Sequence, residues 1–136
     1  MIRNTFKLFN SAIKSSKLLN SNKRFSTVSI LLNKEYTDTG EWIFKEGEHY
    51  KIGLTENSAN ELGELVYLEF DKIVGDVTEF GEDLAIIESV KASASVYAPF
   101  NCEVIENNDK IVNNLEIINK LPECEDSSWL LKVRKM

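Results

Sequence analysis

Beyond residue 40 the hydrophobic positions occur in short runs that alternate with polar positions, a pattern typical of β-strands with one buried face. Tyr50, Ile52 and Leu54 alternate with polar or small residues after the turn at 45–48, and so predict a hairpin with the apolar run 42–44. Further strands are predicted over 65–70, 77–80, 83–90, 92–98, 103–106 and 129–133, with Pro99 ending the long central region and a turn at 107–110.

Only short helices fit between these strands. Thr55 is an N-cap candidate for a helix through Glu61, and Gly63 is a C-terminal stop. The segment 111–126 is irregular, with room for a helix over 115–120. Many short strands separated by close turns predict a mainly β fold, a flattened antiparallel β-barrel or sandwich with one or two short helices.

The first 29 residues differ in composition from the rest of the chain. They carry six basic residues, six serines and no acidic residue, with apolar residues at roughly helical spacing. These features are typical of a mitochondrial transit peptide over 1–30, removed between Arg24 and Asn33, and they predict a matrix location. The remainder, 33–136, is long enough for a single domain with one modest core. A basic tail that binds an anionic partner is the alternative.

The charge of the remainder bounds its partners. The whole chain has 16 basic and 22 acidic residues, so residues 30–136 keep 10 basic and 22 acidic ones, a formal charge of −12. Such a surface repels nucleic acid and anionic membranes and favours partners with basic surfaces. No run approaches the roughly 20 apolar residues that a membrane-spanning helix needs.

The cysteine and histidine residues do not indicate a metal site or a catalytic nucleophile. Cys102 and Cys124 are too few for a disulfide framework, and with His49 they match no standard zinc spacing. Hydrolysis by a serine–histidine–aspartate arrangement would depend on His49, which lies in a polar run beside a turn. We therefore expect no metal site and no catalytic residue.

Lys91 is the residue that this pattern leaves without an obvious role. It stands between two predicted strands, with Ser89, Val90, Ala92 and Ser93 around it. If the chain folds back at Val90–Lys91, a type I turn that accepts ordinary residues would expose the lysine at its tip. A continuous strand with an exposed lysine fits the pattern equally well. A Schiff-base lysine fits poorly, because Glu88 and the polar neighbours favour the charged amine.

The residues Glu88-Ser89-Val90-Lys91-Ala92, followed by Val96-Tyr97-Ala98-Pro99, resemble the lipoyl-attachment hairpin of the glycine cleavage H proteins. Blocks elsewhere are similar to the same family in the same order, so that the resemblance extends from Tyr36 to Val133. They are Glu41-Trp42, Ile52-Gly53-Leu54-Thr55, Ala59, the run from Leu62 to Glu69, and Trp129-Leu130-Leu131-Lys132-Val133. Biotin carriers differ, because they place the lysine between methionines.

The resemblance implies a carrier and not an enzyme. Lipoate would be joined to Lys91 by an amide bond, with Glu88, Ser89, Val90 and Ala92 recognised by lipoyl-attaching enzymes. Glu41 would lie near the cleft that receives the aminomethyl-loaded arm. The implied partners are a pyridoxal-phosphate glycine decarboxylase, a tetrahydrofolate-dependent aminomethyltransferase and the flavin enzyme lipoamide dehydrogenase, with no nucleic acid and no membrane.

The sequence departs from the family pattern at several places. Gly40 stands where the family has histidine, Ser95 where it has aspartate, and Cys102 and Ser128 where it has glycines. The family also continues into a C-terminal helix, whereas this sequence ends at Met136. Two alternatives therefore stay open: a divergent lipoyl protein that serves as donor or carrier for other enzymes, and a non-lipoylated acidic β-module that binds a partner.

Overall fold

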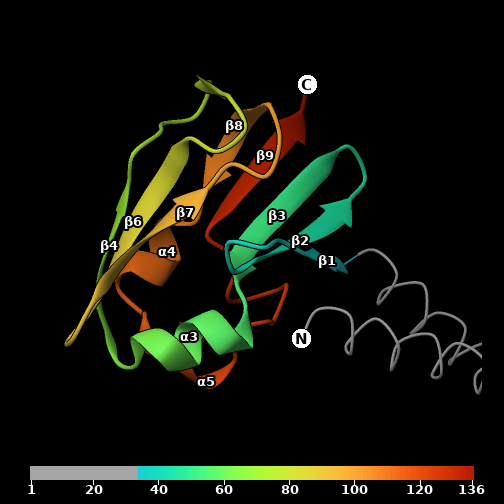
Figure 1. The fold of residues 1–136 in the computed structure, drawn as a ribbon. Helices are drawn as coiled ribbons and strands as arrows, with labels where there is room; N and C mark the ends of the chain where they lie inside the picture. The colour runs from blue at the N-terminus through green and yellow to red at the C-terminus, as the bar shows by residue number, and fades with distance from the viewer. Residues whose placement is uncertain (1–33) are drawn as a thin grey trace, which may run out of the picture. The chain divides into compact units, whose positions relative to one another are not determined.

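The computed structural model describes residues 34–136 (Figure 1). The predicted transit peptide and its processing window lie outside the described residues. Residues Tyr36–Met136 pack together as one unit.

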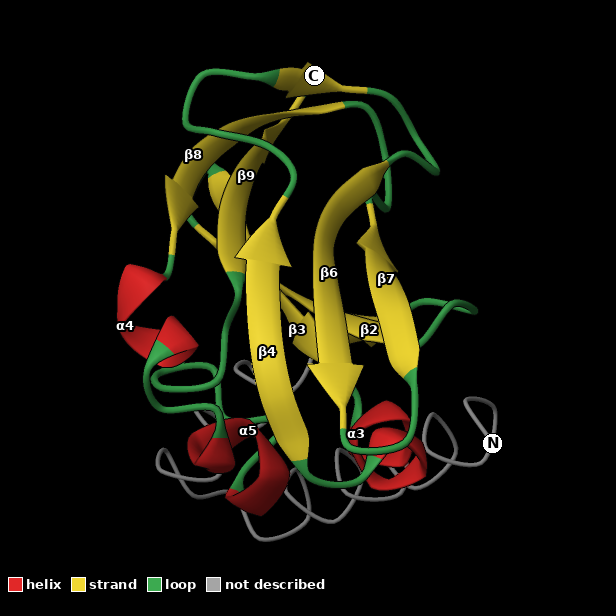
Figure 2. Cartoon of the chain, turned by 90° about the vertical axis from the view of Figure 1, so that its left-hand side faces the viewer, coloured by secondary structure: helices red, strands yellow, loops and turns green. Residues whose placement is uncertain are grey.

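The described chain forms two antiparallel sheets that face each other. The larger sheet has the order β1-β2-β3-β9-β8-β5 and the smaller one the order β4-β6-β7. Figure 2 shows the smaller sheet in front of the larger one. The strands are β1 (Lys34–Tyr36), β2 (Glu41–Glu46), β3 (His49–Leu54), β4 (Leu65–Phe70), β5 (Val77–Thr78), β6 (Asp83–Ser89), β7 (Ser93–Tyr97), β8 (Cys102–Asn107) and β9 (Leu131–Lys135).

Alternation of side chains places one apolar face of each sheet in a shared core. Ile52 of β3, Leu68 of β4, Ile87 of β6 and Val133 of β9 are all buried in it. Burial of such side chains is the main stabilising contribution, roughly 1.5–3 kcal/mol each. The predicted mainly β, flattened sandwich is confirmed, with two facing sheets instead of a closed barrel.

Three short helices accompany the strands in the described residues, one more than the sequence predicted. They are α3 (Glu56–Leu62), α4 (Asp109–Val112) and α5 (Glu116–Lys120). Thr55 caps α3 as expected, since its side chain accepts a hydrogen bond from Ser58 N–H. None of the helices in 34–136 is long and apolar enough to span a bilayer.

The differences from prediction arise where tertiary contacts decide local structure. The turn expected at 107–110 is instead the end of β8 and the start of α4, whose single helical turn buries Ile111 in the core. The last strand begins at Leu131 instead of Trp129, and the strand expected over 77–80 ends at Thr78. No pattern in the sequence predicts β1.

Candidate functional site

Lys91 lies at the tip of a tight hairpin between β6 and β7. Glu88 pairs with Ser93 and Ile87 with Ala94, the register expected if the chain folds back at Val90–Lys91. Ser89 N–H donates to the Ala92 carbonyl at 2.8 Å and closes the turn. The hairpin alternative is therefore confirmed, and the continuous strand is wrong. Lys91 is exposed at this tip.

The Ser89 hydroxyl holds the turn from inside. Its Oγ accepts hydrogen bonds from Lys91 N–H at 3.3 Å and Ala92 N–H at 3.0 Å, and it donates to the Ala92 carbonyl at 3.2 Å. Serine side chains stabilise turns in this way by substituting for backbone partners. Ser89 is buried while both residues of the loop are exposed, so its contribution is to the shape of the turn.

The chain that links α3 to β4 supports the tip from below. Val90 N–H donates to the Glu64 carbonyl at 3.1 Å. Lys91 Cε lies 3.5 Å from the position that a Cβ on Gly63 would occupy, so the lysine stem crosses this glycine. Gly63 has φ of +81°, a conformation that side chains rarely adopt.

The remaining predicted recognition residues surround the lysine on the surface. Glu88, Val90 and Ala92 are exposed, and Val90 has a relative exposure of 70% despite its apolar side chain. An approaching enzyme therefore meets one carboxylate, one apolar side chain and one methyl group around Lys91. Glu88 also lies opposite Tyr67 of β4 in the sheet.

Glu41, the second predicted site residue, is buried at the start of β2, with a relative exposure of 1%. Its Oε1 accepts hydrogen bonds from the hydroxyls of Thr37 at 2.6 Å and Thr39 at 2.5 Å. Its Oε2 accepts a longer one, 3.4 Å, from Tyr97 N–H. A buried carboxylate needs such donors. Glu41 is therefore a buried carboxylate held by three donors, and not an exposed surface glutamate.

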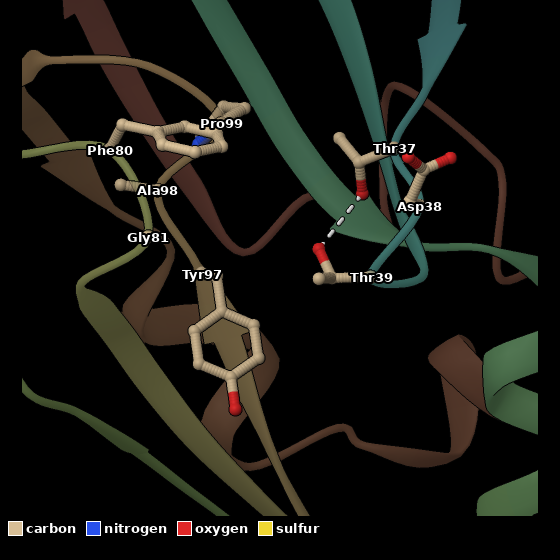
Figure 3. A pocket seen from close by; sticks show the side chains of 8 residues that line it. All are labelled: Thr37, Asp38, Thr39, Phe80, Gly81, Tyr97, Ala98 and Pro99. Carbon is tan, nitrogen blue, oxygen red and sulfur yellow. Dashed lines mark hydrogen bonds between the residues drawn. The ribbon is translucent and has the colours of Figure 1, made fainter.

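The hydroxyls that Glu41 holds belong to a cleft of about 430 Å³. One wall is the β1–β2 link, with Thr37, Asp38 and Thr39. Figure 3 shows Thr37 and Thr39 turned toward each other on this wall, with their hydroxyl oxygens 3.2 Å apart. The facing wall consists of Phe80, Gly81, Tyr97, Ala98 and Pro99. Glu41 itself does not line the cleft and contacts it through the two threonines.

The cleft and the lysine turn lie at the two ends of β7. Ser93 begins this strand just after the turn, and Tyr97 ends it at the cleft. At about 3.3 Å per residue, the strand covers roughly 13 Å. β7 is also an edge of its sheet, so that a group attached at the turn can lie along it. Sequence reasoning missed Thr37, Thr39 and Phe80. No local pattern indicates that the β1–β2 link and the loop before β6 lie on opposite walls of one cleft.

Gly40, which replaces the family's histidine, has a local structural reason. It has φ of +98°, and a Cβ there would overlap Ser58 Oγ. Its carbonyl accepts hydrogen bonds from Thr55 N–H at 3.1 Å and from the Ser58 hydroxyl at 2.9 Å. The β1–β2 link is therefore tied to the first turn of α3, in a contact that leaves no space for a side chain.

The other departures lie away from the attachment turn. Ser95 of β7 is half-buried, lies opposite Ile86 of β6, and does not line the cleft. Cys102 begins β8 in the core, where burial raises the pKa of its thiol to about 11. Ser128 is buried, and its hydroxyl donates to the Leu121 carbonyl at 2.5 Å.

The remaining titratable candidates form no second centre. His49 is half-buried at the start of β3, and no cluster of three or more histidine, cysteine or acidic side chains in 34–136 is arranged to hold a metal ion. A hydrogen bond from the Ser127 side chain lowers the pKa of Cys124, which is only partly buried. Its chemistry is that of an accessible thiol.

Comparison with known proteins covers almost all of the described chain. The profile of the family "Glycine cleavage H-protein" matches residues 34–136. The chain is 41% identical over 100 residues to the glycine cleavage system H protein of Thermotoga maritima, covering 74% of this chain and 78% of that protein. It is 34% identical over 110 residues to the mitochondrial H protein of Flaveria trinervia, covering 81% and 65% respectively.

The fold agrees with the same assignment. The crystal structure of a glycine cleavage system H protein from Mycobacterium marinum superimposes with a TM-score of 0.68 at 26% identity, covering 76% of this chain and 84% of that one. Proteins of this family are carrier subunits and not catalysts, and they hold lipoate covalently on a lysine. On the match over 34–136 and the shared fold, the chain belongs to the glycine cleavage H-protein family.

Proposed function

We propose that Lys91 is the residue that carries lipoate, and that this chain shuttles the aminomethyl group of glycine between the enzymes of the glycine cleavage system. The observation that carries the proposal is an exposed lysine at the tip of a closed β-turn, in a chain of the H-protein family. Lipoate bound there would supply a dithiolane that accepts the aminomethyl group.

The surroundings of Lys91 fit an attached arm. Its Nζ is the atom that would be acylated, and its stem crosses Gly63, which has no side chain to obstruct it. Glu88, Val90 and Ala92 are exposed on the surface for contact with an attaching enzyme, while Ser89 keeps the turn in one shape. A fixed turn reduces the conformational freedom that recognition would otherwise have to restrict.

The cleft at the far end of β7 supports a resting place for the loaded arm. Its volume falls within the range of small-molecule sites. The loaded arm ends in a cationic amine, and the cleft offers two threonine oxygens polarised by the Glu41 carboxylate behind them. Glu41 would act on the amine indirectly. Because each hydroxyl donates its proton to the carboxylate, its oxygen becomes a better acceptor for the cationic amine. Phe80 and Tyr97 supply an apolar wall for the carbon chain of the arm.

The partners follow from this role. We infer a pyridoxal-phosphate glycine decarboxylase that loads the arm, a tetrahydrofolate-dependent aminomethyltransferase that unloads it, and lipoamide dehydrogenase, a flavin enzyme, that reoxidises the dithiol. Lipoyl-attaching enzymes would act first, on Lys91. The net charge of −12 for residues 30–136 favours docking surfaces that are basic.

The attachment site is tested by intact mass after incubation of the full chain with a lipoyl-attaching enzyme and a lipoyl donor. The wild-type chain should gain the mass of one lipoyl group, and Lys91→Arg should gain none while keeping its fold. Lys110→Arg is the matched control, since Lys110 is also exposed but lies in α4, and it should be lipoylated like the wild type. Lipoate on Lys91→Arg would contradict the assignment.

The carrier role is tested by reconstitution with the three enzymes of the system. Lipoylated wild type should support release of CO₂ and ammonia from glycine, and the unmodified chain should not. A lipoylated chain that supports no turnover would instead favour the divergent carrier or donor.

We propose a mitochondrial matrix location, with residues 1–30 as the transit peptide. The support is the basic, serine-rich and acid-free composition of the first 29 residues, together with a mitochondrial relative. Import into isolated mitochondria should yield a shortened protein with an N-terminus between Arg24 and Asn33. A chain that lacks residues 1–29 should stay outside, and unprocessed import of the full chain would contradict the transit peptide.

A further inference from the structure

Asn119 lies in α5, outside every site that the sequence predicted, yet it contacts the backbone that supports the lysine turn. Its side-chain amide nitrogen donates to the Gly63 carbonyl at 2.7 Å. Its amide oxygen accepts a hydrogen bond from Leu65 N–H at 3.1 Å. Both ends of one planar amide are thus used on the same three-residue segment, which fixes that segment in distance and in orientation.

The segment 63–65 supports the hairpin loop that carries Lys91. The Glu64 carbonyl, between the two residues that Asn119 holds, accepts the hydrogen bond from Val90 N–H at 3.1 Å. The Lys91 stem crosses Gly63 at van der Waals distance. The two loop residues of the hairpin therefore both rest on a segment whose position Asn119 sets.

The pairing of the sheet is irregular where this segment enters β4. The pairing of β4 with β6 shifts register between Leu65 and Tyr67, and regular pairing resumes at Tyr67. Such irregularities leave backbone groups without ladder partners. Leu65 lies opposite Ser89 in the ladder, and its N–H donates to Asn119 Oδ1. Since Asn119 is half-buried, water is a weaker substitute for these contacts than it is at an exposed turn.

We propose that Asn119 is a positioning residue, which acts through Gly63, Glu64 and Leu65 to present the Lys91 turn to the lipoyl-attaching enzyme. The inference rests on the proposed function of Lys91. It assigns to α5 the task of holding the turn in a fixed position at the end of β6 and β7. Small displacements of a reacting group matter in such reactions, where a shift of about 1 Å can cost roughly 100-fold in rate.

The test compares Asn119→Leu with the wild-type full chain. Leucine has the same branching and the same number of side-chain heavy atoms, is somewhat larger and forms helices more readily, and removes both hydrogen bonds. Asn114→Leu is the matched control, because the Asn114 side chain also donates to a backbone carbonyl, that of Lys110 at 3.1 Å, but at an exposed position in the link between α4 and α5. Acyl transfer from lipoyl adenylate is followed by mass. An amide forms between Lys91 Nζ and the lipoyl carbonyl carbon, AMP leaves, and the amine loses a proton.

We expect kcat/KM for lipoyl transfer to fall by about tenfold in Asn119→Leu, the order expected for the loss of one or two hydrogen bonds, and to stay unchanged in Asn114→Leu. Hydrogen exchange supplies a readout that does not depend on lipoylation. The Val90 amide should exchange about tenfold faster relative to the Leu130 amide, which is bonded to the Ile52 carbonyl in the core.

Two outcomes would overturn the proposal. One is wild-type transfer kinetics in Asn119→Leu, and the other is an equal loss of protection at Val90 and Leu130, which would make Asn119 a general stabilising residue. If the leucine variant does not fold, Asn119→Asp carries the same test, since it is nearly isosteric and keeps the acceptor for Leu65 N–H. Absence of lipoate from the wild type itself would contradict the proposed function, whereas the exchange result would still decide the role of Asn119.

Discussion

Replacement of the buried Glu41 by glutamine should weaken both the fold and the cleft. The carboxylate accepts two short hydrogen bonds from threonine hydroxyls and a longer one from Tyr97 N–H. Glutamine keeps the shape, but its amide nitrogen cannot accept, so at least one of these donors loses its partner. Hydrogen bonds to a charged group contribute about 1.5–3 kcal/mol and neutral ones about 0.5–1.5 kcal/mol. We therefore expect Glu41→Gln to lower the free energy of unfolding by about 1–3 kcal/mol.

Equilibrium urea unfolding measures this loss, with Glu48→Gln as the control. Glu48 is exposed in the turn between β2 and β3, and its replacement should change stability by less than about 0.5 kcal/mol. A double-mutant cycle with Thr39→Val isolates the contact, and a coupling of about 1 kcal/mol or more is expected, because both partners belong to one network.

The functional consequence is measured as the lifetime of the aminomethyl-loaded carrier in the absence of the transferase. Glu41→Gln should shorten this lifetime and leave lipoylation of Lys91 unchanged, because Glu41 and the turn lie at opposite ends of β7. Unfolding free energy and lifetime both equal to those of the wild type would refute the reasoning. A loss of stability with an unchanged lifetime would restrict Glu41 to a structural role.

Three further predictions concern the turn, the thiols and the docking charge. Ser89→Ala, which removes the hydroxyl that holds the turn, should cost about 1 kcal/mol in urea unfolding and slow lipoylation, whereas Ser93→Ala at the exposed start of β7 should do neither; equal effects would remove the special role of Ser89. Burial raises the pKa of the Cys102 thiol to about 11. Between about pH 9 and 11 the unfolded chain loses this proton while the folded chain keeps it. The free energy of unfolding should therefore fall over this range by at most roughly 2–3 kcal/mol. Cys102→Ala should remove that alkaline loss, and iodoacetamide should modify Cys124 before Cys102, with the reverse order contradicting the burial. The Michaelis constant for the lipoylated carrier at the decarboxylase should rise with ionic strength, because the formal charge of residues 30–136 is −12; a constant value from low to physiological salt would indicate apolar docking.

Local pattern was a good guide to the part of the site that is local in sequence. The hairpin itself is formed by residues adjacent in sequence, and its register follows from the alternation of buried and exposed positions in two adjacent strands. The N-cap of α3 was predictable for the same reason, since Thr55 and Ser58 are three residues apart. The pattern left hairpin and continuous strand open, and the pairing of β6 with β7 and the hydrogen bonds of Ser89 decided between them.

Sequence alone determined the mainly β class, the exposed position of Lys91 and the family to which the chain is similar, because periodicity and short motifs are carried by adjacent residues. Only the tertiary structure decided the cleft, the burial of Glu41 and the support of the turn by Asn119. Tyr97 and Glu41 are 56 positions apart, and Asn119 is 54 positions from Leu65. No local preference encodes such contacts. They form because packing of the two sheets and α5 brings distant backbone donors close to these side chains. Once buried, the polar atoms of both need hydrogen-bond partners.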